Sequence, residues 1–238
     1  MIDFSTLKSM SIPEGNVVKI SSNGATLWQR VTSRIPAEYQ EVEWLQSALT
    51  TGPYIDLGFA FDKKGKTEMS QYFVNTTVAY TFGAAENSGT LRYLLTSPYQ
   101  SAARIAFYGS NGSAYIQNGG DAVADTWNEM IFDVEKGSMH VINKTSGVDA
   151  TSKTQAEYTM TNNLYLFGQN YNGSARTGAG TRRIGYFRYY DKNDTLICDL
   201  VPCYRKSDGV MGMYDIARNI FLTKAGGGDW TKGADVTA

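Results

Sequence analysis

The sequence predicts an all-β protein in which two antiparallel sheets pack face to face. Short runs of apolar residues alternate with polar ones, and turn-forming residues separate the runs at fairly regular intervals. The 24 glycines and 16 tyrosines, with only 5 prolines, are typical of short strands joined by tight turns. No long segment has the period of an amphipathic helix, and no repeat of about 20 to 50 residues occurs. These observations favour a sandwich over alternating β and α units.

The charge balance and the N-terminus narrow the function classes. The 22 basic and 23 acidic residues give a formal net charge of −1, so we expect no nucleic acid and no anionic membrane as a partner. No apolar run approaches the roughly 18 residues that span a bilayer, and residues 1–5 lack the start of a signal peptide. We therefore expect synthesis in the cytoplasm. Cys198 and Cys203 are predicted to be reduced, partly buried thiols, because no second pair exists for a disulfide framework or a zinc site.

A small hairpin is predicted near the N-terminus. Apolar runs at residues 17–20 and 25–28 flank a Ser-Ser-Asn-Gly turn, which is a hairpin signal. A lone hairpin is marginal in water, so we expect it to pack on the main domain or on a partner chain. The predicted organisation is an appendage, residues 1–33, followed by one domain, residues 34–238.

The main domain is predicted to begin with the strand YIDLGF, residues 54–59, after a Thr-Gly-Pro turn. Apolar and β-branched residues between turn signals mark the strands that follow. These further strands are expected at residues 68–74, 78–83, 91–96, 104–108, 114–117, 127–134, 139–143 and 164–168.

Residues 182–230 are the most strongly patterned part of the chain. Strand alternation places Ile184, Tyr186 and Tyr190 on one face of the run 183–190. A polar turn joins this run to residues 196–201, and Pro202 is expected to end that ladder because it has no amide hydrogen.

Apolar and aromatic residues occur on both faces of the run 183–190. This indicates either a strand covered on both sides or a strand whose second face is a binding surface. We expect cover, with the apolar residues of the C-terminal segment folding back over the strand. These residues are Met211, Met213, Ile220 and Phe221.

Three segments resemble, in sequence and spacing, the closing half of laminin-G-like domains. They are WNEMIFDVEKGSMHVINKTSG, NLYLFGQNYNGSA and RRIGYFRYYDKNDTLICDLVPCYRKSDGVMGMYD, at residues 127–147, 163–175 and 182–215. With YIDLGF as the opening strand, the resemblance covers about residues 36–230. It implies a concanavalin-like jelly roll, which is a sandwich of two antiparallel sheets.

Two shorter patterns resemble tail, tail-fibre and virion structural proteins of bacteriophages and prophages. They are VVKISSNGATLWQR, and PCYRKSDGVMGMYD followed by IFLTKAGGGDW. The resemblance implies a virion protein, made in the cytoplasm of a bacterial host, with other virion proteins as partners and a homotrimer as one assembly. The implied function is a receptor-binding module that recognises a bacterial surface glycan.

Sites for sugars combine an aromatic platform with amide or guanidinium groups on loops. Two segments that we expect to be loops, SPYQSAAR and QNYNGSAR, have this composition. The alternative is that their tyrosines only cap the ends of the sandwich. Three tryptophans, Trp44, Trp127 and Trp230, are assigned to the core or its rim. The candidate ligand-binding residues are Tyr99, Gln100, Asn170, Tyr171, Asn172 and Arg176.

Enzyme chemistry has little support in the sequence, and we expect a binding protein. Catalytic members of the concanavalin-like group carry a Glu-x-Asp-x-x-Glu pattern, which is absent here. The nearest candidates, Glu41 and Glu43, are expected to form a solvated strand edge with both carboxylates on one side. The single histidine, His140, has no G-x-S-x-G serine to activate. The alternatives left open are a purely structural virion protein, a glycoside hydrolase and a cell-surface adhesin.

No cofactor is expected. Many laminin-G-like domains hold calcium through carboxylate and backbone oxygens, and Asp121 and Asp125, which follow a Gly-Gly turn, could contribute to such a site. The chain has neither the spacing of an EF-hand nor a dense acidic loop.

Overall fold

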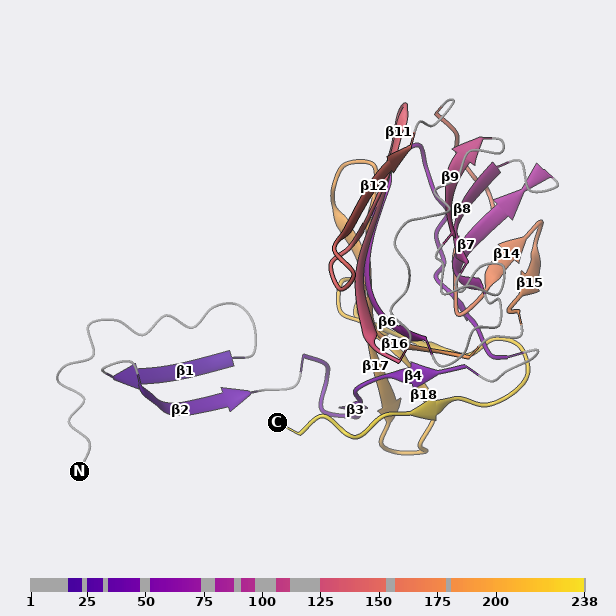
Figure 1. The fold of residues 1–238 in the computed structure, drawn as a ribbon. Helices are drawn as coiled ribbons and strands as arrows, with labels where there is room; N and C mark the ends of the chain where they lie inside the picture. Colours follow the sequence, from indigo (N-terminus) through magenta and orange to yellow (C-terminus); the bar gives the residue numbers. More distant parts are fainter. Residues whose placement is uncertain are drawn as a thin grey trace.

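The computed structural model describes residues 17–22, 25–31, 34–47, 52–73, 80–87, 91–96, 106–111, 125–152, 157–178 and 181–237. The strands of this part of the chain form a small hairpin and two larger sheets (Figure 1). The two larger sheets lie face to face as the layers of a sandwich (Figure 1). The predicted all-β jelly-roll sandwich is therefore confirmed.

The larger of the two sheets has the strand order β12-β11-β10-β6-β16-β17-β18-β19. Three short strands extend it, since β4 pairs with β16 and β20, and β3 pairs with β17. The strands of this large sheet are β3 (Tyr39–Glu41), β4 (Leu45–Gln46), β6 (Gly65–Phe73), β10 (Trp127–Glu135), β11 (Ser138–Asn143), β12 (Val148–Ser152), β16 (Arg182–Tyr190), β17 (Leu196–Arg205), β18 (Met211–Asp215), β19 (Ile220–Thr223) and β20 (Thr231–Lys232).

The smaller sheet is centred on β7, which pairs with β8 on one side and with β13 and β14 on the other. All its pairings are antiparallel except that of β14 with β7, which is parallel. The strands of this small sheet are β5 (Ile55–Asp56), β7 (Tyr80–Glu86), β8 (Leu91–Thr96), β9 (Ala106–Asn111), β13 (Tyr165–Leu166), β14 (Gln169–Tyr171) and β15 (Ser174–Arg176).

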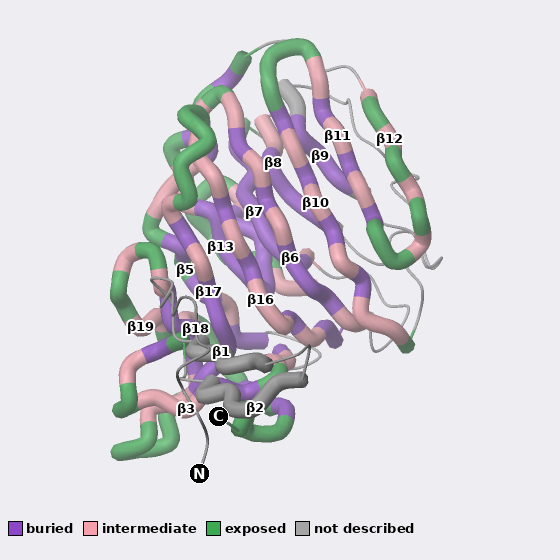
Figure 2. Tube along the Cα trace, turned by 90° about the vertical axis from the view of Figure 1, so that its left-hand side faces the viewer, coloured by how far each residue is buried: buried purple, intermediate pink, exposed green. Residues whose placement is uncertain are grey.

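The hydrophobic core lies between the two sheets. In β10 every second residue is buried, and the same alternation runs along β11, as Figure 2 shows for the large sheet. Aromatic rings from both layers meet there: Phe82 of β7 lies 5.7 Å from Phe132 and 5.5 Å from Phe187 between ring centroids. Such pairs stabilise the sandwich by about 0.5–1.5 kcal/mol each beyond the burial of their area.

A β-bulge in β16 changes which of its residues face the core. The pairing of β16 with β6 shifts register between Ile184 and Tyr186. As a result Ile184 and Phe187 are both buried, although they are three positions apart, while Tyr186 and Tyr190 are half-buried on the opposite face. The predicted grouping of Ile184 with these two tyrosines is wrong, because the extra residue at the bulge reverses the alternation.

Pro202 lies inside β17 and does not end it, contrary to the prediction. The carbonyl of Pro202 accepts a hydrogen bond from the amide of Val42 at 2.9 Å, and the amide position of a strand residue points to the same side as its carbonyl. On that side β17 changes partner, from β16 at Leu200 to β3 at Cys203. The missing amide hydrogen falls where the ladder changes strands, so the sheet tolerates a proline there.

The C-terminal segment does not fold back over β16. Its strands β18 and β19 continue the large sheet beside β17, and Met213 is buried in the main core. Phe221 packs instead with Tyr39, at 4.8 Å between ring centroids. The predicted cover is wrong, because hydrogen bonding to the free edge of β17 places these residues in the sheet and not above it.

Several strand boundaries differ from the prediction. The run YIDLGF contributes only the two-residue strand β5, and two strands, β3 and β4, precede it. The polar strand β12 follows the turn after β11. The predicted strand at residues 114–117 lies outside the described residues.

The N-terminal hairpin pairs β1 (Val17–Ser22) with β2 (Ala25–Val31) in antiparallel register, as predicted. The segment that follows it is bound to the large sheet. Ile35 is buried with Val201, Cys203 and Tyr214 in a second, smaller cluster. The division of the chain at residue 33 and the docking of the hairpin stay predictions.

Candidate functional site

The predicted loop QNYNGSAR is a short hairpin, β14–β15, and not a loop. Its turn residues Asn172 and Gly173 have φ angles of 49° and 85°, the left-handed conformation that an Asn-Gly turn favours. Asn170 is buried and stabilises the turn, because its Oδ1 accepts a hydrogen bond from Gly173 N at 2.9 Å and its Nδ2 donates to Asn163 O at 3.1 Å. Asn170 therefore shapes the hairpin and has little left to offer a ligand.

Tyr171 and Arg176 lie together on this hairpin. The Arg176 guanidinium carbon is 3.4 Å from the centre of the Tyr171 ring. Tyr171 also packs against a cluster of Ala85, Leu94 and Tyr108 on the small sheet. The ring is thus in contact with a cation and with an apolar cluster, which leaves a ligand less of it for stacking.

The other two candidates, Tyr99 and Gln100, lie outside the described residues. Before them, β8 ends at Thr96, and after them, β9 begins at Ala106. Thr96 and Ala106 pair with each other, and Thr96 also pairs with Tyr80 at the start of β7. Tyr171 pairs with Ala85, near the opposite end of β7.

A row of aromatic residues crosses the outer face of the large sheet, the face turned away from the core. Tyr72 pairs in register with Trp127 on one side and with Arg183 on the other. The Arg183 guanidinium carbon is 4.3 Å from the Trp44 ring and 5.0 Å from the Tyr72 ring. Its Nε donates a hydrogen bond to Gln46 Oε1 at 2.9 Å. We call Trp44, Tyr72, Trp127 and Arg183 the outer aromatic row.

Trp127 lies at the edge of this row, over the bulge in β16. A Cβ placed on Gly185 would come within 3.3 Å of the Trp127 ring and 3.6 Å of Glu43 O. The centroids of the Trp127 and Tyr72 rings are 5.7 Å apart, and their planes are inclined at 65°. A glycine at the bulge thus leaves room for the indole to lie against the strand.

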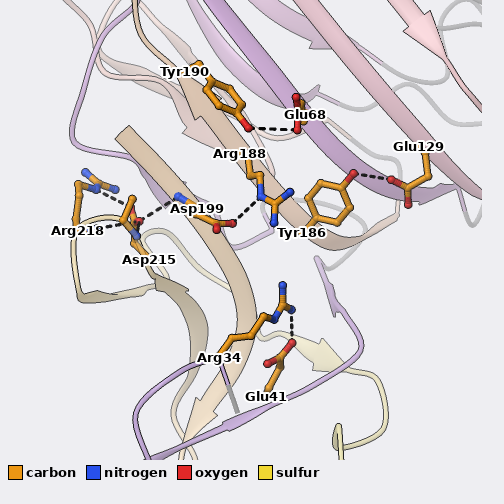
Figure 3. A network of polar contacts seen from close by, with 11 residues as sticks. Arg34, Glu41, Glu68, Glu129, Tyr186, Arg188, Tyr190, Asp199, Asp215 and Arg218 are labelled. Atoms are coloured by element: carbon orange, nitrogen blue, oxygen red, sulfur yellow. Dashed lines mark hydrogen bonds and ion pairs between the residues drawn. The ribbon is translucent and has the colours of Figure 1, made fainter. Parts of the chain in front are cut away.

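A second set of polar pairs adjoins the row on the same face. Figure 3 shows these pairs. The hydroxyl of Tyr186 donates to Glu129 Oε2 at 2.5 Å, and Arg188 Nε donates to Asp199 Oδ1 at 3.0 Å. A longer contact of 3.4 Å joins the Tyr190 hydroxyl to Glu68. We call these six residues the tyrosine–carboxylate ladder.

Two residues of the ladder, Tyr186 and Arg188, have raised pKa values. Burial, together with the bond to Glu129, raises the pKa of Tyr186, so this phenol stays a neutral donor. Burial alone would lower the pKa of Arg188, but its bond to Asp199 and the charge of that carboxylate leave the pKa raised overall. A hydrogen bond to Glu68 raises the pKa of Lys66, which also lies 4.1 Å from the Tyr190 ring centre.

The row and the ladder are half-buried and face outward. Figure 2 looks onto this face, with β10, β6 and β16 in the front layer and no other strand of the described sandwich in front of them. The sequence contained the signal for this surface, since aromatic residues occur on both faces of the run 183–190. The sequence alone favours cover of this face and a site on the loops.

The three tryptophans differ in environment. Trp230 is in the core, 4.6 Å from Phe167 between ring centroids, as predicted. Trp44 and Trp127 are half-buried members of the outer aromatic row, on the face turned away from the core, so their assignment to the core or its rim is wrong.

The carboxylates considered for catalysis have separate partners. Glu41 is buried and paired with Arg34, whereas Glu43 is exposed and accepts a hydrogen bond from the amide of Ala234 at 3.3 Å. The expectation that both form one solvated edge is therefore wrong for Glu41. His140 is partly exposed and pairs with Asp149 at 2.5 Å.

Metal and thiol chemistry were also considered. Within the described ranges, no group of three or more His, Cys, Asp or Glu side chains could hold a metal ion; Asp125 is exposed, and Asp121 lies outside these ranges. Cys198 and Cys203 are free and buried, as predicted. None of the described segments forms a helix that is long and apolar enough to cross a membrane.

No protein-family model and no curated protein matches the chain. Among solved structures, the chain is similar to a putative carbohydrate-binding protein from Bacteroides ovatus, with a TM-score of 0.53 and 10% identity. The match covers 83% of this chain and 62% of the Bacteroides protein, which is less than two thirds of that protein's length. A SAP-like pentraxin from Limulus polyphemus has a TM-score of 0.49 and 12% identity, over 80% of this chain and 94% of that one. For mouse laminin α1 domains LG4-5 the values are 0.49 and 13%, over 71% and 50%. Identities this low concern the fold alone, which is a jelly-roll sandwich.

Proposed function

We propose that this domain is a carbohydrate-binding module that does not cleave its ligand, and that the outer aromatic row is its platform. The observation that carries the proposal is the row itself. Trp44, Tyr72 and Trp127 lie half-exposed on an outward sheet face, with Arg183 between the first two.

The chemistry of sugars fits this arrangement. A sugar ring has an apolar face that stacks on an aromatic ring, and hydroxyl groups around its edge that need hydrogen-bond partners. The Arg183 guanidinium has five N–H donors, of which the bond to Gln46 uses one. The likeness of the fold to a putative carbohydrate-binding protein supports the same class of ligand.

Affinity electrophoresis in gels that contain bacterial surface polysaccharides tests binding directly. We expect at least one polysaccharide to retard the wild-type protein, Trp44→Ala to abolish the retardation and Trp44→Phe to keep part of it. The melting temperature of each variant serves as the control for folding. A wild-type protein that no polysaccharide of the panel retards would remove the proposal.

The non-catalytic part of the proposal has a separate test. Glu41 is already paired with Arg34, so it is poorly placed to act as an acid or a nucleophile. Incubation with the polysaccharide that binds should release no reducing sugar. Release that is lost in Glu41→Gln or in Glu43→Gln would make the protein a glycoside hydrolase instead.

We also propose that the module belongs to a phage tail or virion and engages a glycan of the bacterial host. The support is the resemblance of residues 17–30, 202–215 and 220–230 to phage tail and virion proteins. The rival is a purely structural virion protein, which would bind only neighbouring virion subunits. Binding to host cells that excess polysaccharide inhibits would favour the receptor role, and a stable trimer by light scattering would favour a fibre or tail assembly.

A further inference from the structure

We infer that the tyrosine–carboxylate ladder makes the site selective for neutral sugars over acidic ones. This inference rests on the proposed function, because it describes the part of the ligand that extends beyond the outer aromatic row. The ladder is close enough to take part. Glu129 is two residues from Trp127 on β10, a distance of about 6.6 Å along a strand, and both side chains face outward.

Glu129 has acceptor capacity to spare. Its hydrogen bond from the Tyr186 hydroxyl involves one carboxylate oxygen, Oε2. An ionised carboxylate offers about four lone-pair sites, so other sites remain for the hydroxyl groups of a ligand. Tyr186 fixes the position of the Glu129 carboxylate. It lies on β16, two strands away from Glu129 on β10, and the small residue Ser70 of β6 lies in register between the two.

The charges around Glu129 disfavour an anion. Among the described residues, Arg188 is paired with Asp199 and Lys66 with Glu68, whereas Glu129 forms no ion pair with a basic side chain. Arg183, the cation of the outer aromatic row, lies two strands away from Glu129, on β16 and in the neighbouring row of residues. A carboxylate or sulfate group of a ligand placed at Glu129 would therefore meet a charge that no ion pair neutralises, and like charges at close range repel.

A second carboxylate on the same face adds to this effect. Asp133 lies two rows along β10 from Glu129, and its Oδ1 is buried without a hydrogen-bond partner in the structure. Burial, and then the charge of Glu135, raise the pKa of Asp133. The charges of Lys64 and Lys66 counter this rise, and in its ionised form Asp133 adds its negative charge to that of Glu129.

The test uses one polysaccharide in two forms: a neutral polymer that the wild-type protein binds, and the same polymer after oxidation of its primary alcohols to carboxylates. Titration calorimetry at low salt should show the oxidised form binding at least tenfold more weakly. The variant Glu129→Gln keeps an acceptor for Tyr186 but removes the charge, so it should reduce this ratio to about threefold or less.

Tyr186→Phe is the second variant, and it should weaken binding of the neutral polymer without a change in melting temperature. Three results would overturn the inference while leaving the module a carbohydrate binder: equal or tighter binding of the oxidised form, a ratio unchanged in Glu129→Gln, or full affinity in Tyr186→Phe. A wild-type protein that binds neither form would instead contradict the proposed function itself.

Discussion

The guanidinium of Arg182, at the start of β16, donates a hydrogen bond to the main-chain carbonyl of Phe167 in the opposite sheet. The same group donates to the carbonyl of Thr177 at 3.0 Å. Phe167 and Thr177 stand at either end of the β14–β15 hairpin. The side chain of Arg182, which is 1% exposed, thus ties the base of that hairpin to the large sheet.

Replacing Arg182 with methionine should lower the free energy of unfolding by about 1–3 kcal/mol, because one buried and one partly buried carbonyl would lose a donor. Burial lowers the pKa of Arg182 to about 9, which still leaves the guanidinium charged at neutral pH. Urea denaturation measures the effect. Arg176→Met, which removes an exposed guanidinium from the same hairpin, is the matched control and should change stability much less. Equal stability of the Arg182→Met protein and the wild type would contradict this account.

Two turns of the large sheet each contain an ion pair between an aspartate and an arginine, and the aspartate is buried in one turn and exposed in the other. Asp215 is fully buried and pairs with Arg218, and its Oδ1 also accepts hydrogen bonds from the amides of Asp199 and Ala217 (Figure 3). We expect Asp215→Ala to cost about 3–5 kcal/mol of stability, since it leaves a partly buried cation and several amides without their acceptor.

The control is Asp208→Ala, in the turn after β17. There the ion pair with Arg205 is exposed, with 40% and 43% of the two side chains accessible. Solvent screens such a pair, so this variant should unfold at nearly the same urea concentration as the wild type. Similar losses in the two variants would show that burial is not what gives the Asp215 pair its strength.

The buried thiols give the protein a pH dependence in the alkaline range. Burial raises the pKa of Cys203 to about 12, and that of Cys198 well above its ordinary value. In the unfolded chain the thiols lose their protons near pH 9, while the folded protein keeps them. The contribution of the thiols to stability should therefore be constant below about pH 9 and fall as pH rises toward 12.

The part of this loss of stability that is due to Cys203 can be measured separately. A single thiol contributes a slope of about 1.4 kcal/mol per pH unit in that window. In Cys203→Ala the slope of unfolding free energy against pH should decrease by about that amount, whatever the stability at neutral pH. An unchanged slope would mean that Cys203 ionises as readily in the folded protein as in the unfolded one.

Much of the fold was predictable because it depends on local alternation and turn chemistry. The limits of β8 agree with the prediction to the residue, and the hairpin β16–β17 follows from its polar turn. The local sequence pattern could not predict how hydrogen bonds between strands that are distant in sequence change the strands themselves. The bulge at Gly185 and the continuation of β17 past Pro202 both depend on which strand lies alongside.

The candidate site was predicted less well, and for a related reason. The Asn172-Gly173 dipeptide is a strong hairpin signal, yet its polar neighbours favoured a loop. The aromatic row joins Trp44, Tyr72, Trp127 and Arg183 from distant parts of the chain, and only the order of the strands brings them together. Their types were evident in the sequence, but their common face was not.

The location of the binding surface is the central claim, and one pair of titrations tests it. The polysaccharide that binds the wild-type protein is titrated into Trp127→Ala and into Tyr171→Ala, with melting temperatures as the control for folding. We predict a loss of affinity of at least tenfold, about 1.4 kcal/mol, for Trp127→Ala and a change of less than about twofold for Tyr171→Ala. The opposite result, with Tyr171→Ala weakened and Trp127→Ala unaffected, would place the site on the β14–β15 hairpin and contradict the account.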